Sequence, residues 1–258
     1  MDYKLILINE THDGQVAEVT LQPPPANIVS SAMMDEISHF LAAQQDLPQR
    51  KLIVFSGTGK HFSFGAAVEE HTPEQVGGML PKFHRFIAQL LASRVPTLAK
   101  VTGCCLGGGF EMVLACTFIL ADQKAKFAVP EIKLGVFPPP ASVLLPWRAG
   151  DAFASEMILG GEMLPASRLK ERGVLNSVSE EGALDADLAV FIAQNILPKS
   201  AASLRFACTA ARMSTVAHYE QFIGRLEELY LEGVMNTKDA VEGISAFLEK
   251  RDIKWTNE

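Results

Sequence analysis

Two glutamates with apolar neighbours are the residues of this chain best suited to moving protons. Glu111 lies inside the apolar segment 110–116, and Glu131 follows a short apolar run that ends at Pro130. A carboxyl group that loses contact with water has a raised pKa, closer to the range useful for acid and base catalysis. The structural alternative for each is an acidic residue at a helix start, stabilised by the helix dipole and free amides.

A glycine triplet, Gly107, Gly108 and Gly109, stands shortly before Glu111. Glycines at a turn from strand to helix let a ligand approach the backbone and leave the first amides of the helix unpaired. Such amides attract negative charge, and the helix dipole adds to the attraction. The alternative is a tight turn that packs against a neighbouring element.

The loop 61–67 could supply a second backbone donor. It follows a predicted strand, and Gly65 permits an unusual backbone conformation. An N–H group from this loop could meet one from the glycine triplet and form an oxyanion hole for a carbonyl oxygen. Two carboxyl groups beside such a hole could add or remove water or a proton next to a carbonyl. The alternative is an ordinary loop with aromatic anchors.

Short apolar runs and amphipathic segments alternate before these motifs, which indicates an α/β fold. Strands are predicted at residues 3–8, 16–21, 52–55, 98–101, 118–121, 126–128 and 174–178. Helices are predicted from Ser30 or Ser31 through Leu41, at 73–93, from the glycine triplet to Cys116, and at 151–160, 165–172, 182–196, 200–213, 216–232 and 237–250. In the helix 73–93, we expect a kink or a division near Gly77, Gly78 and Pro81. The later part is therefore mostly helical. We place a boundary near residue 196, between a core with the active site (1–196) and a helical region (197–258).

Composition excludes several classes of protein. The 258 residues are 48% hydrophobic and 21% charged, with a net charge of -7, so a large core is expected and disorder is not. The weakly acidic balance gives no reason to expect a nucleic-acid or membrane partner, although a local basic cluster could still bind phosphate. The N-terminus lacks a secretory pattern, and the four cysteines lack metal-ligand spacing, which favours a cytoplasmic protein with reduced thiols.

Three motifs, residues 62–66, 101–111 and 127–135, resemble those of the enoyl-CoA hydratase/isomerase (crotonase) family in order and spacing. The resemblance implies a crotonase (ClpP-like) superhelix of repeated ββα units and a helical C-terminal region that supports trimers or paired trimers. It also implies an acyl-CoA thioester substrate, oxyanion amides at Ala66 and Gly108, and acid/base roles for Glu111 and Glu131. We expect no metal or redox cofactor, because CoA enters as part of the substrate.

Two departures from the common family pattern narrow the substrate. Ala67 stands where many members have an aspartate, and residues 135–142 carry three consecutive prolines where many members are glycine-rich. These segments resemble the cyclohexa-1,5-dienecarbonyl-CoA hydratase branch, which implies formation of 6-hydroxycyclohex-1-ene-1-carbonyl-CoA in anaerobic benzoyl-CoA degradation. The substrate is expected to contact Phe64, Gly65, Ala67, Gly107, Gly109, Phe137 and Pro138.

Several alternatives stay open at this level. A straight-chain enoyl-CoA hydratase, an isomerase or a dehydratase would use the same fold, and a non-catalytic acyl-CoA-binding subunit would keep it without turnover. Either glutamate could be the base, because a close pair titrates jointly. Other candidate proton carriers are His61, His71 and His84, and candidate contacts for the CoA phosphates are Lys60, Arg94 and Lys100.

Overall fold

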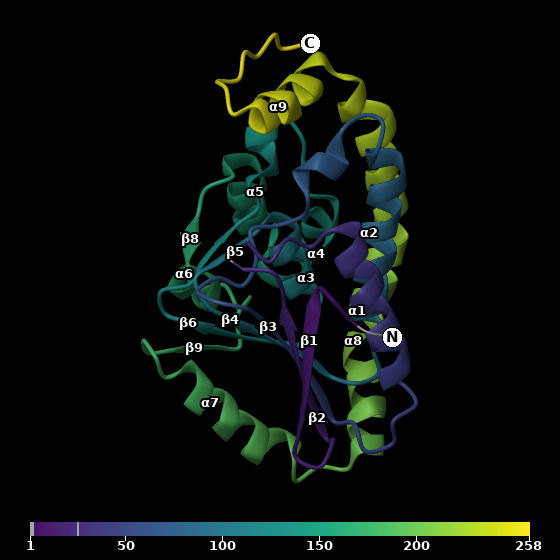
Figure 1. The fold of residues 1–258 in the computed structure, drawn as a ribbon, viewed down its shortest axis with the longest axis vertical. Helices are drawn as coiled ribbons and strands as arrows, with labels where there is room; N and C mark the ends of the chain where they lie inside the picture. Colours follow the sequence, from purple (N-terminus) through teal and green to yellow (C-terminus); the bar gives the residue numbers. More distant parts are fainter. Residues whose placement is uncertain (1–2, 25) are drawn as a thin grey trace.

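The computed structural model describes residues 3–24 and 26–258 and contains two β-sheets (Figure 1). The larger sheet has the order β1-β2-β3-β4-β6-β9, and only its first pair is antiparallel. Its strands are β1 (Ile6–Thr11), β2 (Val16–Leu21), β3 (Leu52–Gly57), β4 (Thr97–Val101), β6 (Phe118–Asp122) and β9 (Ser177–Ser179). The smaller sheet consists of β5 (Cys104–Leu106), β7 (Lys126–Ala128) and β8 (Leu164–Pro165), in that order.

Helices cover both faces of the larger sheet (Figure 1). The α-helices are α1 (Ser31–Gln44), α2 (Val76–Leu91), α3 (Gly107–Ala115), α4 (Pro139–Ala149), α5 (Asp151–Gly160), α6 (Ala166–Glu171), α7 (Leu184–Phe191), α8 (Ala201–Glu228) and α9 (Lys238–Glu249). Shorter turns are the 3-10 helices η1 (Val68–His71), η2 (Pro130–Leu134) and η5 (Val234–Asn236) and the π-helical turns η3 (Ile192–Ile196) and η4 (Leu229–Gly233). The long helix α8 packs along α2 and α4, and α9 lies beyond its end.

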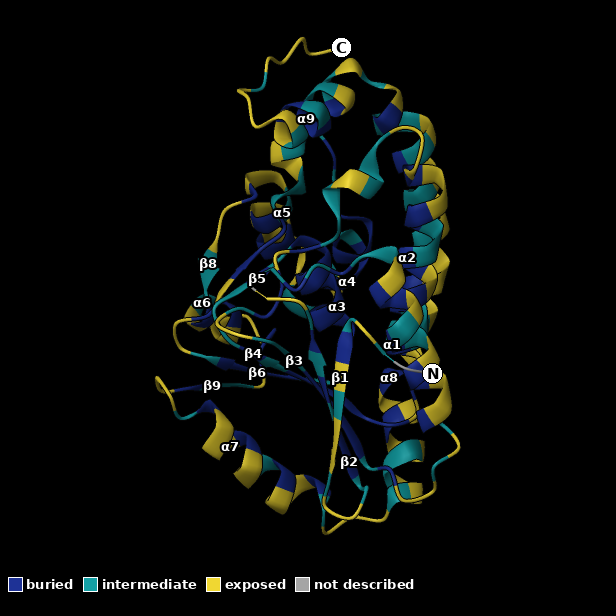
Figure 2. Cartoon of the chain, in the orientation of Figure 1, coloured by how far each residue is buried: buried dark blue, intermediate teal, exposed yellow. Residues whose placement is uncertain are grey.

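The parallel strands are apolar on both faces, since successive side chains of a strand point to opposite sides. Ile53 and Phe55 of β3 face the main core under α1, α2 and α3, whereas Leu52 and Val54 face a second cluster under α7. Figure 2 shows the resulting buried layers on either side of the sheet. Burial on both sides makes the strand ends a rigid support for the loops that follow them.

Several predicted elements are confirmed. β2 and α5 have the predicted bounds. Ser30 is the N-cap of α1, and its side chain accepts a hydrogen bond from the Met33 amide. This is the usual way in which a serine satisfies one free amide of a helix start. The α/β fold class with a helical C-terminal region is likewise confirmed.

Other predictions were wrong. β1 lies three residues later than predicted, because the turn is made by His12 and Asp13, which both have positive φ. The predicted helices 200–213 and 216–232 form one continuous helix through residue 228, stabilised by packing on α2 and α4. The glycine pair and Pro81 do not divide α2, which is continuous from Val76 to Leu91 with Pro81 inside it. A kink near these residues stays a prediction.

The helix α4 and the strands β5 and β8 were not predicted, whereas β7 of the small sheet has the predicted bounds. α4 begins with Pro139 and Pro140 at its first positions, where the fixed φ of proline suits a helix and the missing N–H costs nothing. The boundary near residue 196 stays a prediction, although Tyr219 and Tyr230 of the C-terminal region pack into the main core. No helix within residues 3–24 and 26–258 combines the length and apolar character needed to cross a membrane.

Candidate active site

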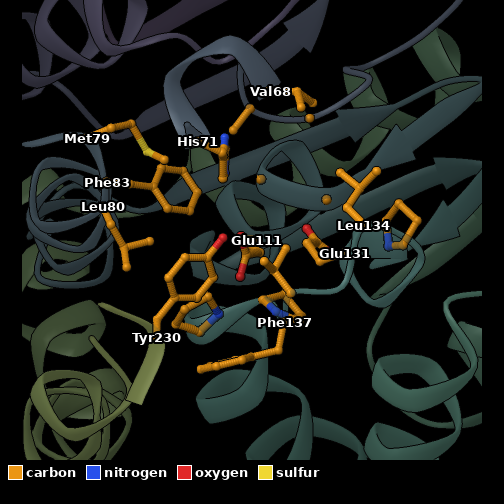
Figure 3. Close-up of a pocket in the computed structure, with 18 of the residues that line it drawn as sticks. Val68, His71, Met79, Leu80, Phe83, Glu111, Glu131, Leu134, Phe137 and Tyr230 are labelled. Atoms are coloured by element: carbon orange, nitrogen blue, oxygen red, sulfur yellow. The ribbon is translucent and has the colours of Figure 1, made fainter. Parts of the chain in front are cut away.

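A pocket with a cavity volume of about 90 Å³ lies where the glycine triplet, the loop after β3, η2 and the end of α8 meet (Figure 3). The lining residues are Phe64, Gly65, Ala66, Val68, His71, Met79, Leu80, Phe83, Gly107, Gly108, Glu111, Pro130, Glu131, Leu134, Val136, Phe137, Pro138, Pro139, Tyr230 and Ile244. Most are apolar, so the few polar groups among them would orient a ligand.

One side of the pocket is formed by backbone, and we name Gly65, Ala66, Gly107 and Gly108 the amide wall. Gly107 and Gly108 begin α3 directly after β5, so their amides have no partner inside the helix. Gly65 has a φ of +113°, which suits glycine alone. Within the described chain, neither Ala66 nor Gly108 donates its N–H to a backbone carbonyl.

The two free amides are neighbours in space. A Cβ atom added to Gly108 would lie 3.1 Å from the Ala66 nitrogen and 3.0 Å from the Ala66 Cβ. The loop is held in place by a backbone hydrogen bond of 2.9 Å from the Val29 amide to the Gly65 carbonyl. The amide wall therefore brings two backbone N–H groups close together, and an oxyanion hole at Ala66 and Gly108 stays a prediction.

Glu131 reaches the pocket from η2, just after β7 and Pro130. A Cβ atom on Gly107 would lie 2.8 Å from its Oε1 atom, so this position must be glycine for the carboxyl group to lie here. The residue as a whole is half-buried, but its Oε2 atom is buried and has no hydrogen-bond partner among the described residues. Burial raises the pKa of Glu131 to about 7, against the opposing effect of its own backbone N–H.

Glu111 lies on α3 and is 3% exposed. Its Oε1 atom accepts a hydrogen bond of 2.9 Å from the Ala141 amide, in the first turn of α4. Burial, and then the neighbouring charge of Glu131, raise the pKa of Glu111 well above its ordinary value, and the Ala141 amide partly offsets this. The two carboxyl groups thus share one site, and around neutral pH the pair can both accept and donate a proton.

Of the three histidines considered, only His71 lines the pocket. Its Nδ1 lies 2.8 Å from the Ala67 carbonyl, and burial lowers its pKa. His61 accepts a hydrogen bond from the Cys104 amide through Nδ1, and His84 pairs with Glu227. His61 and His84 are therefore positioned for structural contacts.

Seven residues were predicted to contact substrate, and five of them line the pocket. The exceptions are Ala67 and Gly109. Gly109 faces inward, where an added Cβ would lie 2.6 Å from the Ser63 side chain, so it packs the helix against the loop. The Ala67 carbonyl is occupied by Glu70 and His71. Direct substrate contacts at these two positions stay predictions.

The basic residues considered for CoA phosphates lie outside the pocket lining. Lys100 pairs with Asp185, and the Arg94 guanidinium donates to the Gln45 carbonyl. Lys60 lies on the loop that leads into the amide wall. A phosphate contact at any of the three stays a prediction.

Sequence reasoning missed several side chains that line the pocket. Met79, Leu80 and Phe83 come from one face of α2, and Tyr230 and Ile244 come from the C-terminal region. The spacing of the α2 residues was a readable signal of a buried helix face. Tyr230 and Ile244 carry no local motif, so only tertiary structure could assign them to the site.

Comparison with known proteins agrees with this geometry. The family model for enoyl-CoA hydratase/isomerase matches residues 11–258. The chain belongs to this family. Among its curated relatives, the cyclohexa-1,5-dienecarbonyl-CoA hydratase of Thauera aromatica is 40% identical over 245 residues, covering 95% of this chain and 94% of the relative. A carnitinyl-CoA dehydratase of Escherichia coli is 32% identical over 254 residues, covering 95% and 96%.

Solved structures of the enoyl-CoA hydratase/isomerase family share its fold. An enoyl-CoA hydratase/isomerase from Xanthobacter autotrophicus is 28% identical, with a TM-score of 0.84 over 97% of this chain and 98% of the other. An enoyl-CoA hydratase from Mycobacterium avium is 26% identical, with a TM-score of 0.85 over 99% and 100%. The protein is accordingly an enzyme of this family, a hydro-lyase.

Proposed function

We propose that the protein adds water to a conjugated acyl-CoA, with cyclohexa-1,5-diene-1-carbonyl-CoA as substrate and 6-hydroxycyclohex-1-ene-1-carbonyl-CoA as product, in anaerobic benzoyl-CoA degradation. The observation that carries the reaction type is the meeting of two buried carboxyl groups with two free backbone amides in one apolar pocket. The identity to the Thauera aromatica enzyme supports the ring substrate.

The amide wall acts on the thioester carbonyl. The carbonyl oxygen accepts hydrogen bonds from the Ala66 and Gly108 amides. Negative charge grows on this oxygen as water adds to the conjugated system, and donors already in position stabilise that charge without reorganising. One such donor is commonly worth about 3 kcal/mol of barrier.

The glutamates move the protons. One of Glu111 and Glu131, in its ionised form, takes a proton from water while the water oxygen bonds to a ring carbon. The other, or the same one after protonation, returns a proton to the far end of the conjugated system. The raised pKa of both groups makes this exchange feasible near neutral pH. No residue is consumed, and the atoms of one water molecule end on the product.

The shape of the pocket favours a flat ring. Phe64 and Phe137 contribute aromatic side chains, and Pro138 and Pro139 form a stiff segment that leads from η2 into α4. Phe137 packs against Tyr230, with 5.3 Å between ring centroids. Rigid apolar surfaces select ligands by shape. A ligand that fits poorly leaves part of these surfaces in contact with water, so its binding lacks the free energy of burying them.

A second candidate is dehydration or hydration of a straight-chain acyl-CoA. The relation to carnitinyl-CoA dehydratases favours it, and the same two glutamates would serve either direction. A non-catalytic acyl-CoA-binding subunit is disfavoured, because two buried carboxyl groups side by side destabilise a fold that gains nothing from them. We further propose a homotrimer or dimer of trimers in the cytoplasm.

Turnover of two substrates separates these candidates. Purified protein is assayed by absorbance with cyclohexa-1,5-diene-1-carbonyl-CoA and with crotonyl-CoA. We expect kcat/KM to favour the ring substrate by at least about 100-fold, since poor fit in an apolar pocket costs a few kcal/mol. Equal values would overturn the ring substrate, and absence of turnover with both would overturn the hydratase assignment.

A further inference from the structure

Tyr230 places a hydroxyl group in the pocket beside the two glutamates. The residue lies on η4, the π-helical turn at the end of α8, and is 1% exposed. Figure 3 shows its hydroxyl pointing toward the carboxyl groups of Glu111 and Glu131. Turns of π-helix are rare and occur often at functional sites, because the extra residue redirects side chains.

The Tyr230 hydroxyl has no hydrogen-bond partner in the described part of the chain. Nearly all buried polar groups in folded proteins have one, so an exception calls for a ligand or a function. The Oε2 atom of Glu131 is buried and unpartnered in the same pocket. A single oxygen atom of a ligand between these groups would satisfy both.

The chemistry of the group makes it a donor. Burial, and then the charges of Glu131 and Glu111, raise the pKa of Tyr230, so its hydroxyl keeps its proton throughout the physiological range. A protonated phenol next to carboxylates donates one hydrogen bond and accepts weakly. The glutamates accept hydrogen bonds from water, whereas the Tyr230 hydroxyl can donate a hydrogen bond to a lone pair of the same water oxygen.

We propose that Tyr230 donates a hydrogen bond to the oxygen atom that is added to, or removed from, the acyl group. This inference rests on the proposed hydration. The attacking water donates hydrogen bonds to the carboxyl groups and transfers one proton to the ionised one, while it keeps its other hydrogen. It accepts a hydrogen bond from Tyr230 with one lone pair and attacks the ring carbon with the other. Tyr230 keeps its proton, and in the product the new hydroxyl oxygen still accepts from it.

The substitution Tyr230→Phe tests this role, because it removes the hydroxyl and keeps the ring against Phe137. The matched control is Tyr219→Phe on the same helix. Tyr219 is also fully buried, but its hydroxyl donates to the His84 carbonyl, outside the pocket lining. We expect kcat to fall roughly 10- to 100-fold in Tyr230→Phe with KM changed less than about three-fold, and kcat to stay within about two-fold in the control.

Binding of two ligands distinguishes a specific contact from packing. The ligands are 6-hydroxycyclohex-1-ene-1-carbonyl-CoA and cyclohexanecarbonyl-CoA, which lacks the hydroxyl. We expect Tyr230→Phe to raise the Kd of the hydroxylated ligand about 10-fold and to leave that of the other unchanged, as one lost hydrogen bond predicts. Equal weakening of both, or of neither, would overturn the role of Tyr230.

The outcomes also separate this inference from the proposed function. If the wild type hydrates only crotonyl-CoA, the ring substrate is wrong, and 3-hydroxybutyryl-CoA and butyryl-CoA replace the ring ligands in the same comparison. If the wild type hydrates the ring substrate and Tyr230→Phe keeps full kcat and both affinities, the inference alone fails.

Discussion

The pocket has two sides of different construction. The amide wall presents main-chain N–H groups from residues 65–66 and 107–108. The position of the Glu131 carboxyl group requires glycine at Gly107. A second part of the lining, which we name the covering wall, consists of the side chains of Val136, Phe137, Tyr230 and Ile244. Main-chain N–H groups are the same for every thioester substrate, whereas the side chains set the shape of the space that holds the acyl group. We infer that the amide wall determines the reaction and the covering wall determines the acyl group.

The two glutamates lie between these walls and depend on both. Glu131 lies against Gly107 of the amide wall, and Glu111 is held by the Ala141 amide at the start of α4. The two carboxyl groups thus lie against different parts of the backbone. Four predictions test this division.

The largest effect is expected from the carboxyl groups. Glu111→Gln and Glu131→Gln should each lower kcat by about 10³-fold or more on every substrate, because each removes a proton carrier from the reaction. Steady-state assays measure the loss, and circular dichroism checks the fold. The exposed Glu74→Gln serves as control. Full activity of either pocket variant would remove that glutamate from the mechanism.

The next largest effect concerns the amide wall. Gly108→Ala places a methyl group 3.0 Å from the Ala66 Cβ and so separates the two donors. We expect kcat to fall about 100-fold for ring and straight-chain substrates alike. Gly224→Ala is the matched control, since nothing lies within 4 Å of its added methyl. A loss confined to one substrate would contradict the inferred division between the walls.

The third prediction concerns stability and pH. The pKa of Glu131 is raised to about 7 in the fold, so its ionisation opposes folding. The wild type should lose stability as pH rises from the unfolded pKa through 7, and Glu131→Gln should lose less over the same range, because only Glu111 of the pair then ionises against burial. At pH 8.5 the variant should be roughly 2–3 kcal/mol more stable, and at pH 4 the difference should vanish. Urea unfolding at fixed protein concentration measures it, and equal stability at pH 8.5 would show that the carboxyl group is solvated.

The smallest effect is expected on the covering wall. Phe137→Ala should reduce the preference for the ring substrate over crotonyl-CoA about 10-fold and leave kcat for crotonyl-CoA nearly unchanged, because only shape and apolar contact are lost. The exposed Leu159→Ala is the control. Competition between the two substrates in one reaction measures the ratio. An equal loss on both substrates would assign Phe137 to the chemistry.

The same contrast explains how far sequence reasoning reached. The amide wall and both glutamates come from short motifs at strand ends, where glycine and proline restrict the backbone in readable ways, and the structure brings them together. Tyr230 and Ile244 reach the pocket only because α8 runs unbroken along α2 and α4. The predicted break near residue 214 was wrong because tertiary packing outweighs local propensity.

The proline-rich segment is another place that sequence reasoning did not reach. No element was predicted at 138–140, yet the last two of the three consecutive prolines begin α4 and thereby place the Ala141 amide on Glu111. The preferences of proline show which positions of a helix tolerate it, but they do not show at which of three consecutive prolines a helix begins. The contact between Glu111 and α4 therefore required the structure.

The central claim is that the amide wall polarises a conjugated thioester held beside the two glutamates. The most direct measurement is the absorption spectrum of cyclohexa-1,5-diene-1-carbonyl-CoA bound to the double variant Glu111→Gln/Glu131→Gln, which cannot turn it over. We expect the absorption maximum to shift to longer wavelength on binding, and Gly108→Ala in the same background to abolish the shift. A saturably bound thioester whose spectrum matches that of the free ligand would contradict the account.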